Sequence, residues 1–205
     1  MPLARRGYAI VAVELGAGLA AVARRNLARF SGVEVVNTAF EDWPLPAEPF
    51  DAVFAATAFH WIEPAVALER AAAALRPGGA LAVVTTSHVA GGDDAFDALQ
   101  NECYERFMPG AKVGERLPAA AAVPSERAAL EAGGHFAAAV ARRYERDIEY
   151  TAAAYLDVLC TYSSHRAMAP DAREALLRCV ERLIDERGGR IVKRYLNELV
   201  VARRA

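Results

Sequence analysis

The sequence predicts an α/β fold in which an open, mostly parallel, doubly wound sheet carries helices on both faces. Short apolar runs rich in β-branched residues, at 9–15 and 50–54, are typical of strands in such a sheet. Amphipathic helical patterns alternate with these runs. A Pro-Gly-Gly motif at 77–79 separates one such helix from the apolar strand at 80–86. Residues 50–86 therefore form one predicted strand–helix–strand unit.

Composition and charge narrow the classes of function. The chain has 205 residues, which suits one domain with a full core. Its net charge of -2 gives no general attraction to nucleic acid or to an anionic membrane. We find no charge-free apolar run long enough to cross a bilayer and no secretory signal. We expect a cytoplasmic protein with no nucleic-acid or membrane partner.

The three cysteines, Cys103, Cys160 and Cys179, are far apart and lack the spacing of a metal site. In a cytosolic protein such residues are most simply reduced and buried. We expect three free thiols.

The first part of the chain alternates strand and helix. Residues 9–15 are expected to be buried on both faces, with one charge, Glu14, at the carboxyl end. A helix is predicted over 19–30 and a further strand over 33–36. In an open parallel sheet, ligands bind outside the carboxyl ends of the strands. Glu14 is therefore a candidate site residue.

The stretch 50–61 is predicted to begin as a buried strand and to end as a site-forming loop, Ala55 to Trp61. Pro64 suits the first turn of the next helix. That helix is expected to end before Leu75, with 75–79 as a stop ahead of the strand at 80–86.

Residues after 86 are less regular. Asp93 or Asp94 is expected to cap a helix that runs towards Phe107, and Ser125 to cap a short helix ending near residue 133. The remaining predicted elements are strand 144–150, helices 152–162 and 170–187, and a final strand of mixed pattern over 191–201.

The pieces Val13-Glu14-Leu15, residues 37–44, Phe59-His60-Trp61 and Leu75 to Leu81 have an order and spacing that resemble the class I S-adenosylmethionine-dependent methyltransferases of the small-molecule type. The resemblance covers residues 1 to about 86. It implies a Rossmann-like fold and a single methyltransferase-like domain over 1–205. Within it, 1–86 would be the cofactor-side half, 87–140 a substrate-covering segment, and 141–205 a terminal strand–helix–helix–strand region.

The resemblance implies a set of residues that bind S-adenosylmethionine. Glu14, followed by Leu15, matches the acid that accepts hydrogen bonds from both ribose hydroxyls, and we favour this interpretation over an ordinary strand-end charge facing water. Ala39 stands where the family often has a carboxylate for adenine, so there the chain departs from the pattern. The backbone of Phe40 could serve adenine, or Phe40 could be core. The loop that matches the methionine-facing backbone is Ala55-Ala56-Thr57.

His60 and Trp61 match a pair that lies beside the methyl-transfer centre in similar relatives. His60 could orient the acceptor or take its proton, and Trp61 could wall the pocket. Alternatively, His60 caps the following helix and Trp61 packs on the sheet. His88 is a weaker candidate. We find no metal-ligand cluster in the sequence.

The family's first strand and glycine-rich motif should stand before Glu14, and the chain begins too late for them. A competing register takes Glu14-Leu15-Gly16-Ala17-Gly18 as that motif and 9–15 as the first strand. We favour the register in which 9–15 is the second strand and the central first strand is missing. We therefore expect a truncated relative that binds cofactor weakly or not at all.

The predicted function is methyl transfer from S-adenosylmethionine to a small-molecule acceptor. One alternative is a non-catalytic methyltransferase-like remnant or interaction protein, which could form a homodimer through exposed strands. A second alternative is a nicotinamide-dependent oxidoreductase in which Glu14 binds a ribose of the cofactor. We favour it less, because no complete Gly-x-Gly-x-x-Gly motif follows a strand.

Overall fold

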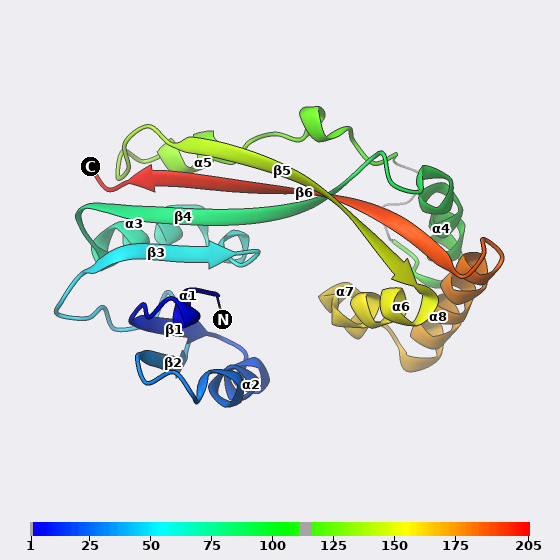
Figure 1. Cartoon of the computed structure of the whole chain (residues 1–205), viewed down its shortest axis with the longest axis horizontal. Coiled ribbons are helices and arrows are strands. Elements are labelled where there is room, and N and C mark those ends of the chain that lie inside the picture. The colour runs from blue at the N-terminus through cyan, green and yellow to red at the C-terminus, as the bar shows by residue number, and fades with distance from the viewer. Residues whose placement is uncertain (1, 111–115) are drawn as a thin grey trace. The chain divides into compact units, whose positions relative to one another are not determined.

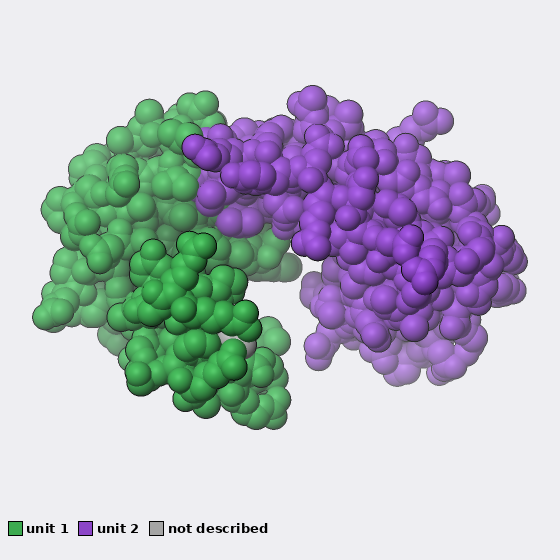
Figure 2. Space-filling model, viewed as in Figure 1, with its two compact units in different colours: residues 1–83, 127–140, 201–205 green, residues 84–126, 141–200 purple. Residues whose placement is uncertain are grey.

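The computed structural model describes residues 2–110 and 116–205 (Figure 1). The chain divides into two compact units (Figure 2). The first unit comprises Met1–Val83, Arg127–Val140 and Val201–Ala205, and the second comprises Val84–Glu126 and Ala141–Val200. The long strands contribute residues to both units. The predicted division at residues 86 and 140 stays a prediction.

The first unit contains the elements that carry the family-like motifs. Its elements in chain order are α1 (Pro2–Arg5), β1 (Ile10–Glu14), α2 (Ala17–Leu27), β2 (Val33–Asn37), β3 (Phe50–Ala56), the 3-10 helix η1 (Phe59–Trp61), α3 (Pro64–Ala74), the start of β4 (Leu75–Val89) and α5 (Arg127–Glu131). Each strand or helix predicted before residue 75 is present, with ends displaced by a few residues.

The strands form two sheets. β1 and β2 make a parallel pair in which Ile10 lies opposite Val33 and Glu14 lies opposite Asn37. The other sheet has the order β3-β4-β6-β5, with β5 at Val140–Thr151 and β6 at Arg190–Arg203. β6 is antiparallel to β4: near the start of β4, the Gly78 N–H donates to the carbonyl of Arg204, just after the end of β6. The predicted mixed α/β class, with a mostly parallel sheet flanked by helices, is confirmed (Figure 1).

The expectation that the strands at 9–15 and 50–56 are buried is wrong. All five residues of β1 are only partly buried. No residue of β3 is fully buried, and Phe54 is 54% exposed. The reason is pairing: within the described residues, β1 pairs only with β2 and β3 only with β4. Each strand therefore keeps one open edge.

We expected Leu75 to Gly79 to end the helix and to separate it from the following strand. Instead, β4 begins at Leu75, directly after α3. The backbone is tightly packed here. A Cβ on Gly79 would come within 2.8 Å of the Arg76 carbonyl oxygen and 3.2 Å of the Asp51 carbonyl oxygen. The Pro-Gly-Gly motif is thus part of the sheet, and the glycine permits a close approach between strands.

The second unit packs helices against the far parts of the long strands. Its helices are α4 (Asp94–Phe107), η2 (Ala120–Ala122), α6 (Ala152–Thr161), α7 (Ser163–Arg166) and α8 (Pro170–Asp185). Its core includes Phe96, Leu159, Leu176 and Val180. The predicted cap of α4 is confirmed, because the Asp93 carboxylate accepts a hydrogen bond from the Phe96 N–H at 3.0 Å.

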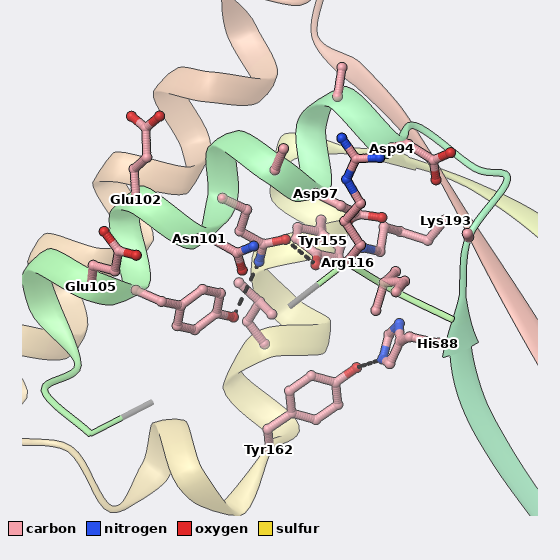
Figure 3. Close-up of a pocket in the computed structure, with 17 residues that line it drawn as sticks. His88, Asp94, Asp97, Asn101, Glu102, Glu105, Arg116, Tyr155, Tyr162 and Lys193 are labelled. Carbon is pink, nitrogen blue, oxygen red and sulfur yellow. Dashed lines mark hydrogen bonds and ion pairs between the residues drawn. The ribbon is translucent and has the colours of Figure 1, made fainter. Parts of the chain in front are cut away.

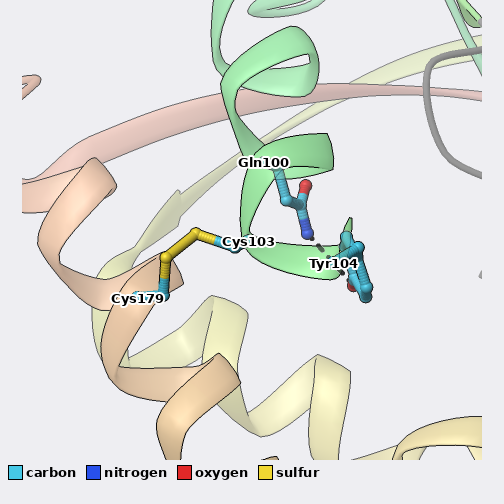
Figure 4. Close-up of a disulfide and its surroundings, with 4 residues drawn as sticks. All are labelled: Gln100, Cys103, Tyr104 and Cys179. Atoms are coloured by element: carbon cyan, nitrogen blue, oxygen red, sulfur yellow. Dashed lines mark hydrogen bonds between the residues drawn. A yellow bond between two sulfur atoms is a disulfide. The ribbon is translucent and has the colours of Figure 1, made fainter. Parts of the chain in front are cut away.

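The expectation of three reduced, buried cysteines is wrong. Cys103 on α4 and Cys179 on α8 form a disulfide with Cα atoms 5.9 Å apart (Figure 4). Cys160 is free and exposed. The pairing was not visible in the sequence because the two residues are 76 positions apart, and only the packing of α4 on α8 brings them together.

Two charged residues on β6 are buried. Lys193 is 4% exposed and Glu198 is 3% exposed. Lys193 pairs with Asp97 of α4, and the Arg143 Nε of β5 donates to Glu198 at 2.8 Å. Glu198 also accepts the Glu126 N–H at 2.9 Å. These buried charged residues explain why polar and apolar residues are mixed in the sequence of the final strand.

Among the described residues, no helix has both the length and the apolar character needed to cross a membrane.

Replacement of Glu198 by Gln tests the buried pair. Burial by itself would raise the pKa of Glu198, but hydrogen bonds from Arg143, Glu126 and Ser125 outweigh it and lower the pKa. We expect E198Q to reduce the free energy of unfolding at pH 7 by about 1–3 kcal/mol. Urea unfolding followed by circular dichroism measures this.

The sign of the pH dependence follows from the lowered pKa. The stabilisation by ionised Glu198 is present above the ordinary carboxyl pKa and is lost as the pH falls through the folded-state value. The difference between wild type and E198Q should therefore shrink below about pH 4. The control E174Q, in an exposed pair with Arg178, should change little. A difference unaltered by acid would contradict the role of the charge.

Candidate functional site

Glu14 lies at the carboxyl end of β1, as predicted, and local bonds fix its position. Its Oε1 accepts the Gly16 N–H at 2.7 Å. The Asn37 side-chain amide donates to the carbonyls of Glu14 and Leu15 at 2.8 and 2.9 Å. Asn37 thus ties the ends of β1 and β2 together. Leu15 is 74% exposed.

The loop after β2 is fixed by an arginine from α3. The Arg70 Nε donates to the Phe40 carbonyl at 2.9 Å, and the same guanidinium donates to the Trp43 carbonyl. The Phe40 and Trp43 rings stack, with centroids 6.3 Å apart. Phe40 and Ala39 are partly buried. The loop therefore has a defined conformation, and Arg70 was not singled out from the sequence.

The loop Ala55-Ala56-Thr57 begins at the last residues of β3. Thr57 has φ +48°, and it is the one non-glycine residue with positive φ among those the structure describes. This conformation is unfavourable for a β-branched residue, and such strain is concentrated at functional sites. Thr57 is exposed, so the strain is not offset by burial of its side chain.

His60 and Trp61 lie in η1, directly after this loop. Their rings are 5.0 Å apart between centroids. The alternative in which His60 caps the next helix is wrong, because Glu63 caps α3 by accepting the Val66 N–H at 2.9 Å. The alternative in which Trp61 packs on the sheet is also wrong, since Trp61 is 73% exposed. Their predicted roles beside the reaction centre stay predictions.

The geometry at Gly16 and Gly18 and the pairing of β1 help to decide whether β1 is the first or the second strand of the family's sheet. Gly16 is the N-cap of α2 with φ −77°, and Gly18 lies inside that helix. A Cβ on Gly18 would meet nothing within 4 Å. As the first strand, β1 would also pair with β3, which it does not do in the described chain. The lack of a β1–β3 pairing favours β1 as the second strand of the family's sheet.

A cavity of about 850 Å³ lies in the second unit, lined by side chains from β4, α4, α6 and β6 (Figure 3). His88 comes from β4, and its Nε2 is 3.1 Å from the Tyr162 hydroxyl oxygen. Lys193 and Asp97 meet at the wall formed by β6 and α4. Of this group only His88 was a sequence candidate.

Burial sets the protonation of the cavity's aromatic groups. The pKa of His88 is lowered by burial first and by the nearby Lys193 ammonium second, while Asp97 opposes the shift. Burial raises the pKa of Tyr104 to about 12. Gln100 accepts from the Tyr155 hydroxyl at 3.1 Å and donates to the Tyr104 hydroxyl at 3.2 Å. At neutral pH these rings are uncharged hydrogen-bonding groups.

Sequence comparison finds a similarity to methyltransferases over the first 83 residues. A family model described as "Methyltransferase domain" matches residues 1–83. An uncharacterised methyltransferase of Mycobacterium tuberculosis is 40% identical over 82 residues, and a protein of Mycobacterium bovis matches to the same extent. The aligned segment is 40% of this chain and 32% of each relative. The chain therefore matches about a third of the length of these relatives.

Structural comparison extends the likeness in fold over almost the whole chain. A protein described as a type II methyltransferase from Anaeromyxobacter dehalogenans has a TM-score of 0.59 at 21% identity, covering 94% of this chain and 79% of its own. A methyltransferase structure from Bacillus halodurans has a TM-score of 0.54 at 19% identity, covering 94% and 81%. The family model over residues 1–83 confirms the predicted resemblance to methyltransferases, and these two structures add a likeness of fold.

Replacement of Thr57 by Asn tests the strained loop. Asn tolerates the left-handed region better than a β-branched residue, so T57N should raise the free energy of unfolding by about 1 kcal/mol. The control T57V removes the hydroxyl but keeps the β-branch, and it should give no gain. Thermal and urea unfolding of both variants provide the measurement. Equal stability of T57N and T57V would contradict the strain.

Titration of His88 tests the electrostatics of the cavity. Its imidazole pKa, followed by NMR of the ring C–H, should lie below the ordinary value of about 6.5. K193M should raise it, because a neighbouring cation is removed, and D97N should lower it. His165 is an internal control, since its lowered pKa has burial as its cause. A His88 pKa that is the same in both variants would contradict the assigned charge effects.

Proposed function

We propose that this protein takes part in S-adenosylmethionine-dependent methyl transfer to a small molecule. The observation that carries the proposal is the parallel register of β1 and β2, in which Glu14 lies opposite Asn37 at the carboxyl ends. These ends belong to the segment that matches the methyltransferase domain, residues 1–83. Ligand sites of open α/β sheets lie at such ends.

The residues at these ends suit the adenosine part of the cofactor. One carboxylate oxygen of Glu14 accepts from Gly16, and the other has no hydrogen bond within the described residues, so it is available to a ribose diol. Arg70 fixes the backbone of Phe40 by donating a hydrogen bond to its carbonyl oxygen. Ala39 leaves adenine without a side-chain carboxylate. The open edges of β1 and β3 mean that the described residues enclose only part of such a ligand.

When bound, S-adenosylmethionine supplies a methyl group that its sulfonium makes electrophilic. The protein's task is then mainly alignment and exclusion of water. The small residues Ala55 and Ala56, with the strained Thr57, would permit close approach of the methionine part. His60 would orient the acceptor or receive its proton, and Trp61 would wall the site.

One related structure supports the choice of cofactor. Phosphoethanolamine N-methyltransferase 2 of Haemonchus contortus was solved with phosphomonomethylethanolamine and S-adenosylhomocysteine. Its TM-score to this chain is 0.50 at 13% identity, covering 97% of this chain and 44% of its own. The likeness is one of fold, and the acceptor of that enzyme is not carried over.

Titration with S-adenosylhomocysteine, followed by NMR chemical shifts, tests the cofactor site. We expect weak binding, with shifts confined to residues near Glu14, Phe40 and Thr57. E14Q should weaken it by roughly tenfold to a hundredfold, because a charge-assisted hydrogen bond is lost. E34Q is the matched control, since Glu34 is an exposed carboxylate on the neighbouring strand β2.

A folded protein that shows no shifts would contradict the proposal for this chain. That result would favour the alternative of a non-catalytic methyltransferase-like protein that acts through its open strand edges. A homodimer formed through those edges would then be the species to seek by sedimentation.

A further inference from the structure

The cavity of the second unit contains a buried cation with hydrogen-bonding capacity to spare. The Lys193 ammonium has three hydrogens, and its side chain is 5% exposed. Asp97 accepts one of them. The other contacts of the ammonium are with the ring faces of Phe96 and Tyr155, at 5.8 and 5.9 Å from the centroids. Among the described residues, Asp97 is the one acceptor to which the ammonium has a hydrogen bond.

A second polar group stands in the same cavity. His88 and Tyr162 point toward each other across 3.1 Å (Figure 3). Between a hydroxyl and a neutral imidazole one partner donates and the other accepts, so the Tyr162 oxygen keeps capacity for a further hydrogen bond. The cavity therefore offers a cationic donor at Lys193 and a neutral hydrogen-bonding pair at His88 and Tyr162.

Part of the remaining wall is apolar and aromatic. Leu117 and Leu159 line the cavity together with the Tyr155 ring. Leu159 is 1% exposed, which places it among the core residues. The cavity volume of about 850 Å³ falls in the range of small-molecule sites, roughly 300–1,000 Å³. A flat ring would find apolar contact here over both its face and its edge.

The charges of the lining select against anions. Lys193 is already compensated by Asp97. Among the described residues that line the cavity, the other charged ones are one arginine, Arg116, and three carboxylates, Asp94, Glu102 and Glu105. An anionic ligand would enter a cavity with a surplus of negative charge and would disturb the Lys193–Asp97 pair. A neutral oxygen acceptor avoids both costs.

We propose that this cavity binds a neutral aromatic molecule that carries a carbonyl oxygen for Lys193 and a hydroxyl group for the His88–Tyr162 pair. The chemical class is that of hydroxyaryl ketones and related phenols. Binding needs only the second unit. That the ligand is the methyl acceptor rests on the proposed function.

Calorimetry with 4-hydroxyacetophenone, in the absence of any nucleoside, tests the proposal on the full chain. We expect one-to-one binding that K193M weakens by roughly tenfold to a hundredfold, since a hydrogen bond from a charged donor is lost. R190M is the matched control, because Arg190 is an exposed cation on the same strand. The isosteric anion 4-hydroxybenzoate should bind at least tenfold more weakly.

Because K193M leaves Asp97 buried without its partner, the double variant K193M/D97N serves if the single variant does not fold. It should bind the ketone roughly tenfold to a hundredfold more weakly than the wild type. No binding to the wild type, equal binding to K193M, or tighter binding of the benzoate would overturn the proposal. These outcomes are independent of S-adenosylhomocysteine binding, so failure here is distinct from failure of the proposed function.

Discussion

The arrangement of the second unit depends on the need to pair two buried charges of β6. A buried charge without a partner is strongly destabilising, so Lys193 and Glu198 restrict what can pack against the strand. Lys193 requires Asp97, which fixes the register of α4. Glu198 requires Arg143, whose guanidinium also donates to the carbonyls of Ala120 and Val123 at 3.2 and 2.6 Å. One strand thereby positions both a helix and a connecting segment.

The cavity is a consequence of this constraint. With α4 held to β6 by Asp97 and to α8 by the Cys103–Cys179 disulfide, the helix has little freedom to collapse onto α6. The hydrogen bond from the Tyr155 hydroxyl to Gln100 connects α6 to α4, and Gln100 is held in turn by its bond to Tyr104 on the same helix. The space between them is therefore held open by satisfied polar contacts, and a ligand would find its partners already oriented.

The sequence predicted what local chemistry determines. The apolar run at β1, the Asp93 cap and the order of helices and strands all depend on residues near one another in the chain. Interactions across long separations were not predictable. Lys193 and Asp97 are 96 positions apart, and the paired cysteines 76. Arg70 was missed for the same reason, since its role is defined by carbonyls some thirty residues earlier.

The proposed cofactor site has two separate requirements: its polar groups must be oriented, and it must enclose the ligand. The open edges of β1 and β3 affect only the second. Local bonds orient the individual groups: Gly16 holds the Glu14 carboxylate, Asn37 joins two strand ends, and Arg70 holds the Phe40 loop. None of these bonds depends on a partner for β1 or β3 at their open edges. Enclosure of a ligand does depend on one, because a paired sheet is what brings strand ends together. In the first unit, local bonds orient these groups while β1 and β3 each keep an open edge. The proposed nucleoside titration would therefore measure how much orientation alone contributes.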